Sequence, residues 1–251
     1  MLLGIYNYTT ILSYLNLFVG FLGIVLALNN NYKIATICLL IAGICDMFDG
    51  LVSRSKKNRT IFEKKYGIQI DSLADMISFG CLPIFINYSL ITNLIGEECY
   101  LLSIKVPKPY FLFWFISYFY ILAALIRLSY FNAISEKKLK NKNPNNNSQF
   151  FIGIPVTFSA IIFPCIILIE SIISKIVKEN KIKFLDNNLI SNIIINIYFI
   201  LLMILTFLFV FSKIKIKKPT KNCINILSFF SCLMIILLIL FKSYDSINLK
   251  L

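Results

Sequence analysis

The chain has 251 residues, of which 58% are hydrophobic and only 15% are charged. This composition excludes an ordinary soluble domain, because the charged residues stand in short clusters between long apolar runs, as in a polytopic helical membrane protein. The net charge of +13 would suggest nucleic acid as the partner of a soluble protein. Here the lysines lie beside apolar segments, which favours membrane lipids and phosphorylated ligands as partners and no nucleic acid.

Seven apolar segments follow one another, each near the roughly 20 residues that cross a bilayer as a helix. The expected spans are 10–28, 32–48, 70–94, 110–131, 151–173, 189–211 and 223–241. The first has no charged region before it and no small-residue cleavage site, so we expect a retained helix rather than a cleaved signal peptide. We therefore expect an all-α membrane protein in one domain (1–251), with a core over about residues 10–211 and an extra C-terminal helix.

The distribution of lysine and arginine favours a cytoplasmic N-terminus. On that assignment, the loops at 54–70, 132–150 and 212–222 hold fifteen of the 25 Lys and Arg residues, and the opposite side holds nine. The polar run at 141–149 is expected to be a cytoplasmic loop. We expect a multi-pass protein of the cytoplasmic membrane, with the basic loop at 54–70 facing the cytoplasm.

Four aspartates flank that basic loop: Asp46 and Asp49 before it, Asp71 and Asp75 after it. Spacings of three and four place each pair on one face of a helix. A carboxylate near the centre of a spanning helix costs about 2.5–3.5 kcal/mol, and clustered carboxylates repel one another. A divalent cation with hard oxygen ligands resolves both problems. The alternative is that the four are helix-end carboxylates facing water.

Residues suited to phosphate surround the aspartates. Gly50 directly follows Asp49 and allows a ligand close to the backbone. Arg54 is a permanent cation one turn further on, able to bind a phosphate through two donors. Ser53 is small, and Gly67 precedes Asp71 by four residues. The chain has no histidine, so acid–base chemistry must use a carboxylate, lysine, tyrosine or cysteine.

In this order the residues resemble the signature of the CDP-alcohol phosphatidyltransferases. The matching positions are Asp46-x-x-Asp49-Gly50-x-x-Ser53-Arg54 and Gly67-x-x-x-Asp71-x-x-x-Asp75. Four runs resemble the phosphatidylserine synthase branch in particular: LNLFVG (15–20), DSLADMISFGCLP (71–83), LIRLSYFN (125–132) and FFIGIP (150–155). Two departures stand out. Ser53 replaces the usual alanine, and twelve residues (55–66) separate Arg54 from Gly67 where the family usually has fewer, which predicts a longer loop.

The resemblance implies six core helices around a polar cavity open to the cytoplasm, and two divalent ions, Mg²⁺ or Mn²⁺. It implies that CDP-diacylglycerol donates its phosphatidyl group to the hydroxyl of L-serine and releases CMP. The implied metal ligands are Asp46, Asp49 and Asp71, with Asp75 close to the metals and acting as general base. The implied contacts to the CDP moiety are Gly50, Ser53, Arg54 and Gly67. The family also allows a homodimer.

The carboxylate of an amino-acid acceptor needs a cation. Arg127 is the one Arg or Lys well inside an expected span, and an arginine in that position is a functional candidate. The alternative is that Arg127 snorkels to the interface or pairs with an aspartate. Ser72, Ser78 and Asn132 are further candidates for binding serine, with helix packing as the alternative for each.

Two other functions fit parts of the pattern. A sister enzyme would use glycerol phosphate or inositol phosphate as the acceptor, although the run 71–83 argues for serine. A membrane transporter for ions or metals would also carry intramembrane acids, but transporters tend to spread them over several helices. Here the acids cluster around one loop.

Overall fold

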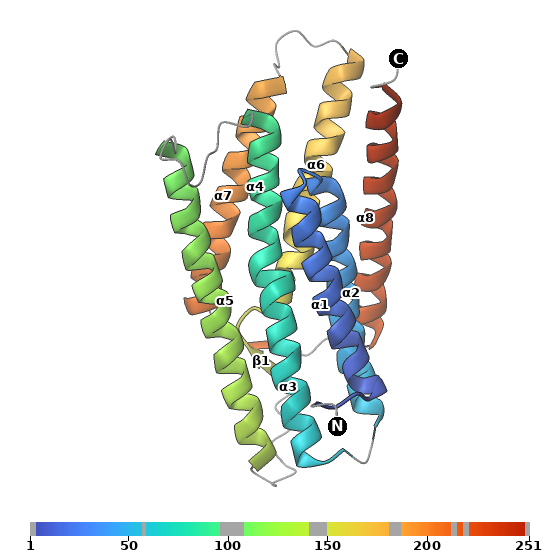
Figure 1. Cartoon of the computed structure of the whole chain (residues 1–251), viewed down its shortest axis with the longest axis vertical. Coiled ribbons are helices and arrows are strands. Elements are labelled where there is room, and N and C mark those ends of the chain that lie inside the picture. The colour runs from blue at the N-terminus through green and yellow to red at the C-terminus, as the bar shows by residue number, and fades with distance from the viewer. Residues whose placement is uncertain are drawn as a thin grey trace.

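The computed structural model describes residues 4–56, 59–95, 108–140, 150–180, 187–211, 215–217 and 221–248. Within these residues, seven helices are long and apolar enough to cross a membrane. The expectation of a multi-pass, helical membrane protein is therefore confirmed. The helices lie roughly side by side in one bundle, and α1 begins at the opposite end from the one where α8 finishes, as an odd number of spans requires (Figure 1).

The first two helices, α1 (Tyr8–Leu28) and α2 (Tyr32–Ser55), form the predicted antiparallel hairpin. Its turn contains Asn30, whose φ of 59° lies in the left-handed region that asparagine tolerates better than most residues. Helix α2 continues beyond the expected end of the span at residue 48. Both aspartates of the first pair, and Gly50 and Ser53 after them, therefore lie on regular helix.

The third span begins earlier than predicted. Helix α3 (Ile61–Asp75) runs into a π-helical segment, η1 (Met76–Cys81), and then into α4 (Leu82–Ile95). The start of α3 is set by Thr60, which forms a capping box with Glu63 and so satisfies free N–H groups of the first turn. The third segment begins inside the loop expected at 54–70, because residues 61–70 form the first turns of α3.

The π-helical segment η1 is stabilised by neighbouring helices. Pro83 has no N–H to donate to the carbonyl of Phe79 four residues earlier. That carbonyl instead accepts hydrogen bonds from the Tyr120 hydroxyl at 2.9 Å and the Ser159 hydroxyl at 3.4 Å. The segment follows Asp75 directly, and π-helical turns are often found at functional sites.

The remaining helices are α5 (Lys108–Lys140), α6 (Ser159–Asn180), α7 (Asn187–Phe211) and α8 (Lys221–Asn248). The fifth span does not start at residue 151 as expected. Residues Phe150–Ile152 form a strand, β1, that pairs antiparallel with β2 (Lys215–Lys217), and a short 3₁₀ turn, η2 (Val156–Phe158), leads into α6. The predicted loop at 141–149 lies outside the described residues.

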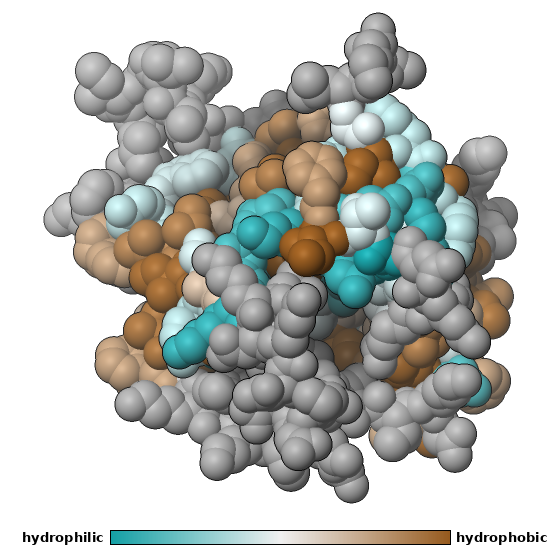
Figure 2. All heavy atoms as spheres, turned by 90° about the horizontal axis from the view of Figure 1, so that it is seen from below, coloured by the Kyte–Doolittle hydropathy of each residue, from teal (hydrophilic) through white to brown (hydrophobic). Residues whose placement is uncertain are grey.

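The core of the bundle is apolar and aromatic. Tyr120, Phe163 and Tyr198 from α5, α6 and α7 are fully buried and pack ring against ring. Helix α8 packs against α2 and α6. At the end of the bundle where α2 finishes and α3 begins, hydrophilic side chains gather on the described surface (Figure 2). The four aspartates lie near this end.

Candidate metal and phosphate site

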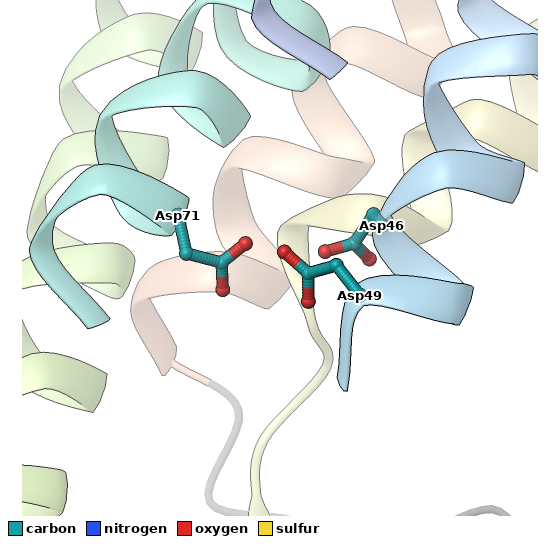
Figure 3. A group of neighbouring side chains, drawn as sticks. All are labelled: Asp46, Asp49 and Asp71. Carbon is teal, nitrogen blue, oxygen red and sulfur yellow. The ribbon is translucent and has the colours of Figure 1, made fainter. Parts of the chain in front are cut away.

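Three of the four aspartates converge. Asp46 and Asp49 project from α2 and Asp71 from α3, and their carboxylates point toward one another across the space between the two helices (Figure 3). One oxygen from each lies within 4.8 Å of the others. The three-residue spacing on α2 thus places both side chains on one helix face, as the sequence predicted.

The donor set fits a divalent cation. It consists of carboxylate oxygens, the hard ligands that magnesium, calcium and manganese prefer. The Asp71 Oδ1 atom is buried and has no hydrogen-bond partner among the described residues, and leaving such an atom unsatisfied is costly. Asp49 accepts a hydrogen bond of 2.7 Å from the Ser13 hydroxyl on α1. The Asp49 carboxylate is therefore oriented by Ser13, and the Asp71 Oδ1 atom is available to bind an ion.

Asp75 lies one turn beyond Asp71, outside this group of three. It is buried, and its Oδ1 accepts a hydrogen bond of 3.0 Å from the Asn16 side-chain amide. The main-chain carbonyl of Asn16 accepts a hydrogen bond from the Ser78 hydroxyl, so η1 also contacts α1 here. Asp75 is therefore not one of the three converging carboxylates, and Asn16 is its own orienting partner.

The sequence offered Asn16 as a residue that reaches the nucleotide or packs between helices, but it did not predict that α1 orients the aspartates. Ser13 and Asn16 each orient one aspartate. The signal was available, because two polar residues three apart on an apolar helix lie on one face and imply a polar partner across it.

The residues expected to contact a nucleotide lie just beyond the aspartates. Gly50 and Ser53 follow Asp49 on α2, and the Ser53 hydroxyl donates a 3.3 Å hydrogen bond to the Gly50 carbonyl. Gly67 lies on α3, one turn before Asp71. Arg54 belongs to the last turn of α2, and its side chain lies outside the part of the structure that is described.

The candidates for acceptor binding have packing partners. Arg127 on α5 is 8% exposed, and its Nε donates a 3.2 Å hydrogen bond to the Ile154 carbonyl. Its guanidinium lies against Gly153, where φ is +81° and a side chain would collide with the guanidinium carbon. The Ser72 hydroxyl donates to the Asn132 side chain at 2.7 Å, which joins α3 to α5. Arg127 thus connects α5 to the segment before α6.

The arrangement defines a class of protein. Residues 6–204 match the family model of the CDP-alcohol phosphatidyltransferases, and the chain belongs to this family. The match covers α1 through most of α7 and includes the four aspartates.

The chain is similar to several curated proteins at 25–28% identity. The chain is 28% identical over 151 residues to archaetidylserine synthase of Methanothermobacter thermautotrophicus, covering 60% of this chain and 53% of that protein. It is 25% identical over 186 residues to CDP-diacylglycerol–serine O-phosphatidyltransferase of Helicobacter pylori strain J99 (73% and 63%). It is 26% identical over 150 residues to the protein of that name from Mycobacterium tuberculosis H37Rv (60% and 45%). The chain therefore spans between 45% and 63% of the length of these relatives.

Proposed function

We propose that this protein is a phosphatidylserine synthase, which transfers the phosphatidyl group of CDP-diacylglycerol to the hydroxyl of L-serine and releases CMP. The observation that carries the proposal is the convergence of Asp46, Asp49 and Asp71 in a member of this family. The choice of serine is supported by the similarity to archaetidylserine synthase and to two proteins named CDP-diacylglycerol–serine O-phosphatidyltransferase.

The three clustered aspartates would hold two divalent ions, Mg²⁺ or Mn²⁺, with Asp75 nearby. Bound there, the ions would neutralise charge on the diphosphate of the lipid substrate. Gly50, Ser53, Arg54 and Gly67 would contact the CDP moiety. The site would face the cytoplasm in a single membrane domain, which allows a soluble amino acid to reach a lipid whose tails stay in the bilayer.

Asp75 is the proposed general base. It takes the proton from the serine hydroxyl, whose oxygen forms a bond to the phosphatidyl phosphorus as the bond from that phosphorus to the CMP oxygen breaks. The Asn16 side-chain amide donates a 3.0 Å hydrogen bond to Asp75 Oδ1, which orients the carboxylate, and Oδ2 is the oxygen proposed to take the proton. Positioning of this kind supplies much of the rate, because a carboxylate near two cations is a weak base.

An acceptor assay tests the proposal directly. CMP release from CDP-diacylglycerol is measured with L-serine, glycerol phosphate, inositol phosphate or no acceptor, each with magnesium, manganese or calcium. We expect release that requires L-serine and one of these ions. Release driven by glycerol phosphate or inositol phosphate would assign a sister enzyme, and the absence of CMP under every condition would favour transport.

Arg127 is proposed to bind the serine carboxylate. We expect Arg127→Ala to raise the KM for serine about tenfold or more, as the loss of a charged hydrogen bond does, with a smaller change in the KM for the lipid. Because Arg127 also joins α5 to Ile154, the thermal midpoint of each variant is measured as well. Arg127→Lys, which keeps the charge, should recover part of the serine affinity. An unchanged serine KM in Arg127→Ala would reject the role.

A further inference from the structure

The longer connection between α2 and α3 carries a cation, Arg59, that the family signature does not include. The connection is held at both ends. Glu63 caps α3 together with Thr60, and its carboxylate also accepts from Lys56 at 3.0 Å and from the Asn7 amide at 2.9 Å. Arg59 directly precedes the capping residue, so its backbone is placed by these contacts.

The Arg59 guanidinium extends between the two helices. Its Nη1 donates a 3.1 Å hydrogen bond to the Ser53 carbonyl in the last turn of α2. Its Nη2 would lie 2.8 Å from a Cβ placed on Gly67 of α3. Both neighbours belong to the set expected to contact the CDP moiety. Gly67 leaves the space that the guanidinium occupies.

The third nitrogen, Nε, is not accounted for by packing. It is buried and has no hydrogen-bond partner among the described residues. If Arg59 served only to cap the C-terminus of α2, its bond from Nη1 to the Ser53 carbonyl would be explained. That role would not explain why its buried Nε has no acceptor among the described residues. An arginine presents its donors in a planar fork that matches phosphate oxygens.

The position relates Arg59 to the clustered aspartates. Ser53 is four residues beyond Asp49 on α2, and Gly67 is four residues before Asp71 on α3, which corresponds to about 6 Å along each helix. Arg59 therefore bridges the two helices one turn from the carboxylates, toward the α2–α3 connection. A diphosphate held beside Asp49 and Asp71 would lie next to this guanidinium.

We propose that Arg59 is a substrate-binding residue that donates hydrogen bonds to a phosphate oxygen of the CDP moiety. The inference rests on the proposed use of a CDP-linked lipid, but it does not depend on serine as the acceptor. The group that Arg59 would bind is an anionic phosphate, and not the cytosine ring or the acyl chains.

The test is binding of CDP to the purified full chain in detergent, measured by calorimetry with Mn²⁺ present and no acceptor. We expect Arg59→Ala to raise the Kd for CDP about tenfold or more, as the loss of hydrogen bonds to a charged group does.

Two control variants are matched to Arg59→Ala. Lys137→Ala removes an exposed cation of α5, and Lys56→Ala breaks the ion pair that anchors the same connection. Both should bind CDP within about twofold of wild type, because surface ion pairs and charges contribute little.

The outcomes separate the possibilities. A Kd for Arg59→Ala equal to that of Lys137→Ala would overturn the inference and leave the proposed function intact. Equal weakening in Arg59→Ala and Lys56→Ala would assign Arg59 to loop anchoring and also overturn it. If wild type binds CDP, Arg59→Ala does not, and no CMP is released with serine, the inference holds and the acceptor assignment fails. If wild type does not bind CDP, both fail.

Discussion

Replacing Asp75 with asparagine is expected to reduce the rate of CMP release about a thousandfold, within the range that a positioned general base contributes. Asparagine keeps the shape of the side chain and an oxygen that can accept the bond from the Asn16 amide. It cannot take a proton from the attacking hydroxyl. Because Asp75 lies outside the three clustered carboxylates, CDP binding should change by no more than a few-fold. Single-turnover CMP release and CDP calorimetry measure the two effects separately.

Thr92→Val provides the control for this variant. Thr92 is a buried polar residue at the far end of the same span, where its hydroxyl bonds the Asn30 side chain at 2.8 Å. Its loss should lower the thermal midpoint without changing the rate of CMP release. Full activity in Asp75→Asn would remove Asp75 as the base. A parallel loss of CDP binding would instead assign Asp75 to the metal and phosphate site.

Much of the fold follows from the sequence because its signals are local. Seven apolar runs are bounded by charged or asparagine-rich breaks, and length alone makes each a span. The packing of α2 against α3 near the aspartates also follows from the sequence. Asp46 and Asp49 on one helix and Asp71 on the other can share a cation that neutralises their charge only if the two helices face each other.

The α2–α3 connection was predicted poorly for a physical reason. The run 61–66 mixes charged and aromatic residues and has no strong apolar period, so only the Thr60 and Glu63 capping box reveals that it is helical.

Other parts of the site depend on contacts between distant segments. Ser13 and Asn16 are 36 and 59 residues away from the aspartates that they orient, and no local pattern specifies those pairs. Two further contacts are equally non-local. They are the strand pairing between residues 150–152 and 215–217 and the position of Arg127 against Gly153. Sequence pattern therefore identified the aspartates that converge, and the tertiary structure supplied the residues that orient them.

Asp71→Asn is expected to have opposite effects with and without metal. Without an ion, three carboxylates whose oxygens lie within 4.8 Å of one another repel, so neutralising one should raise the thermal midpoint measured in a chelator. With an ion at about 100 times its Kd, wild type should gain about 2.7 kcal/mol from binding, equivalent to a rise of several degrees. Asp71→Asn should lose most of that gain, together with metal-dependent CDP binding.

Glu136→Gln controls for the general effect of removing a negative charge. Glu136 lies on α5 near the same end of the bundle, accepts a 3.5 Å hydrogen bond from Gln69 and belongs to no acidic cluster among the described residues. Its metal-dependent stabilisation should equal that of wild type. A helix-end carboxylate facing water would behave like Glu136 in both conditions, whereas a metal ligand must show the reversal. If the wild-type midpoint is the same in chelator and in manganese, and Asp71→Asn shifts neither value, the clustered aspartates do not bind a metal and the phosphotransfer chemistry proposed for them has no electrostatic basis.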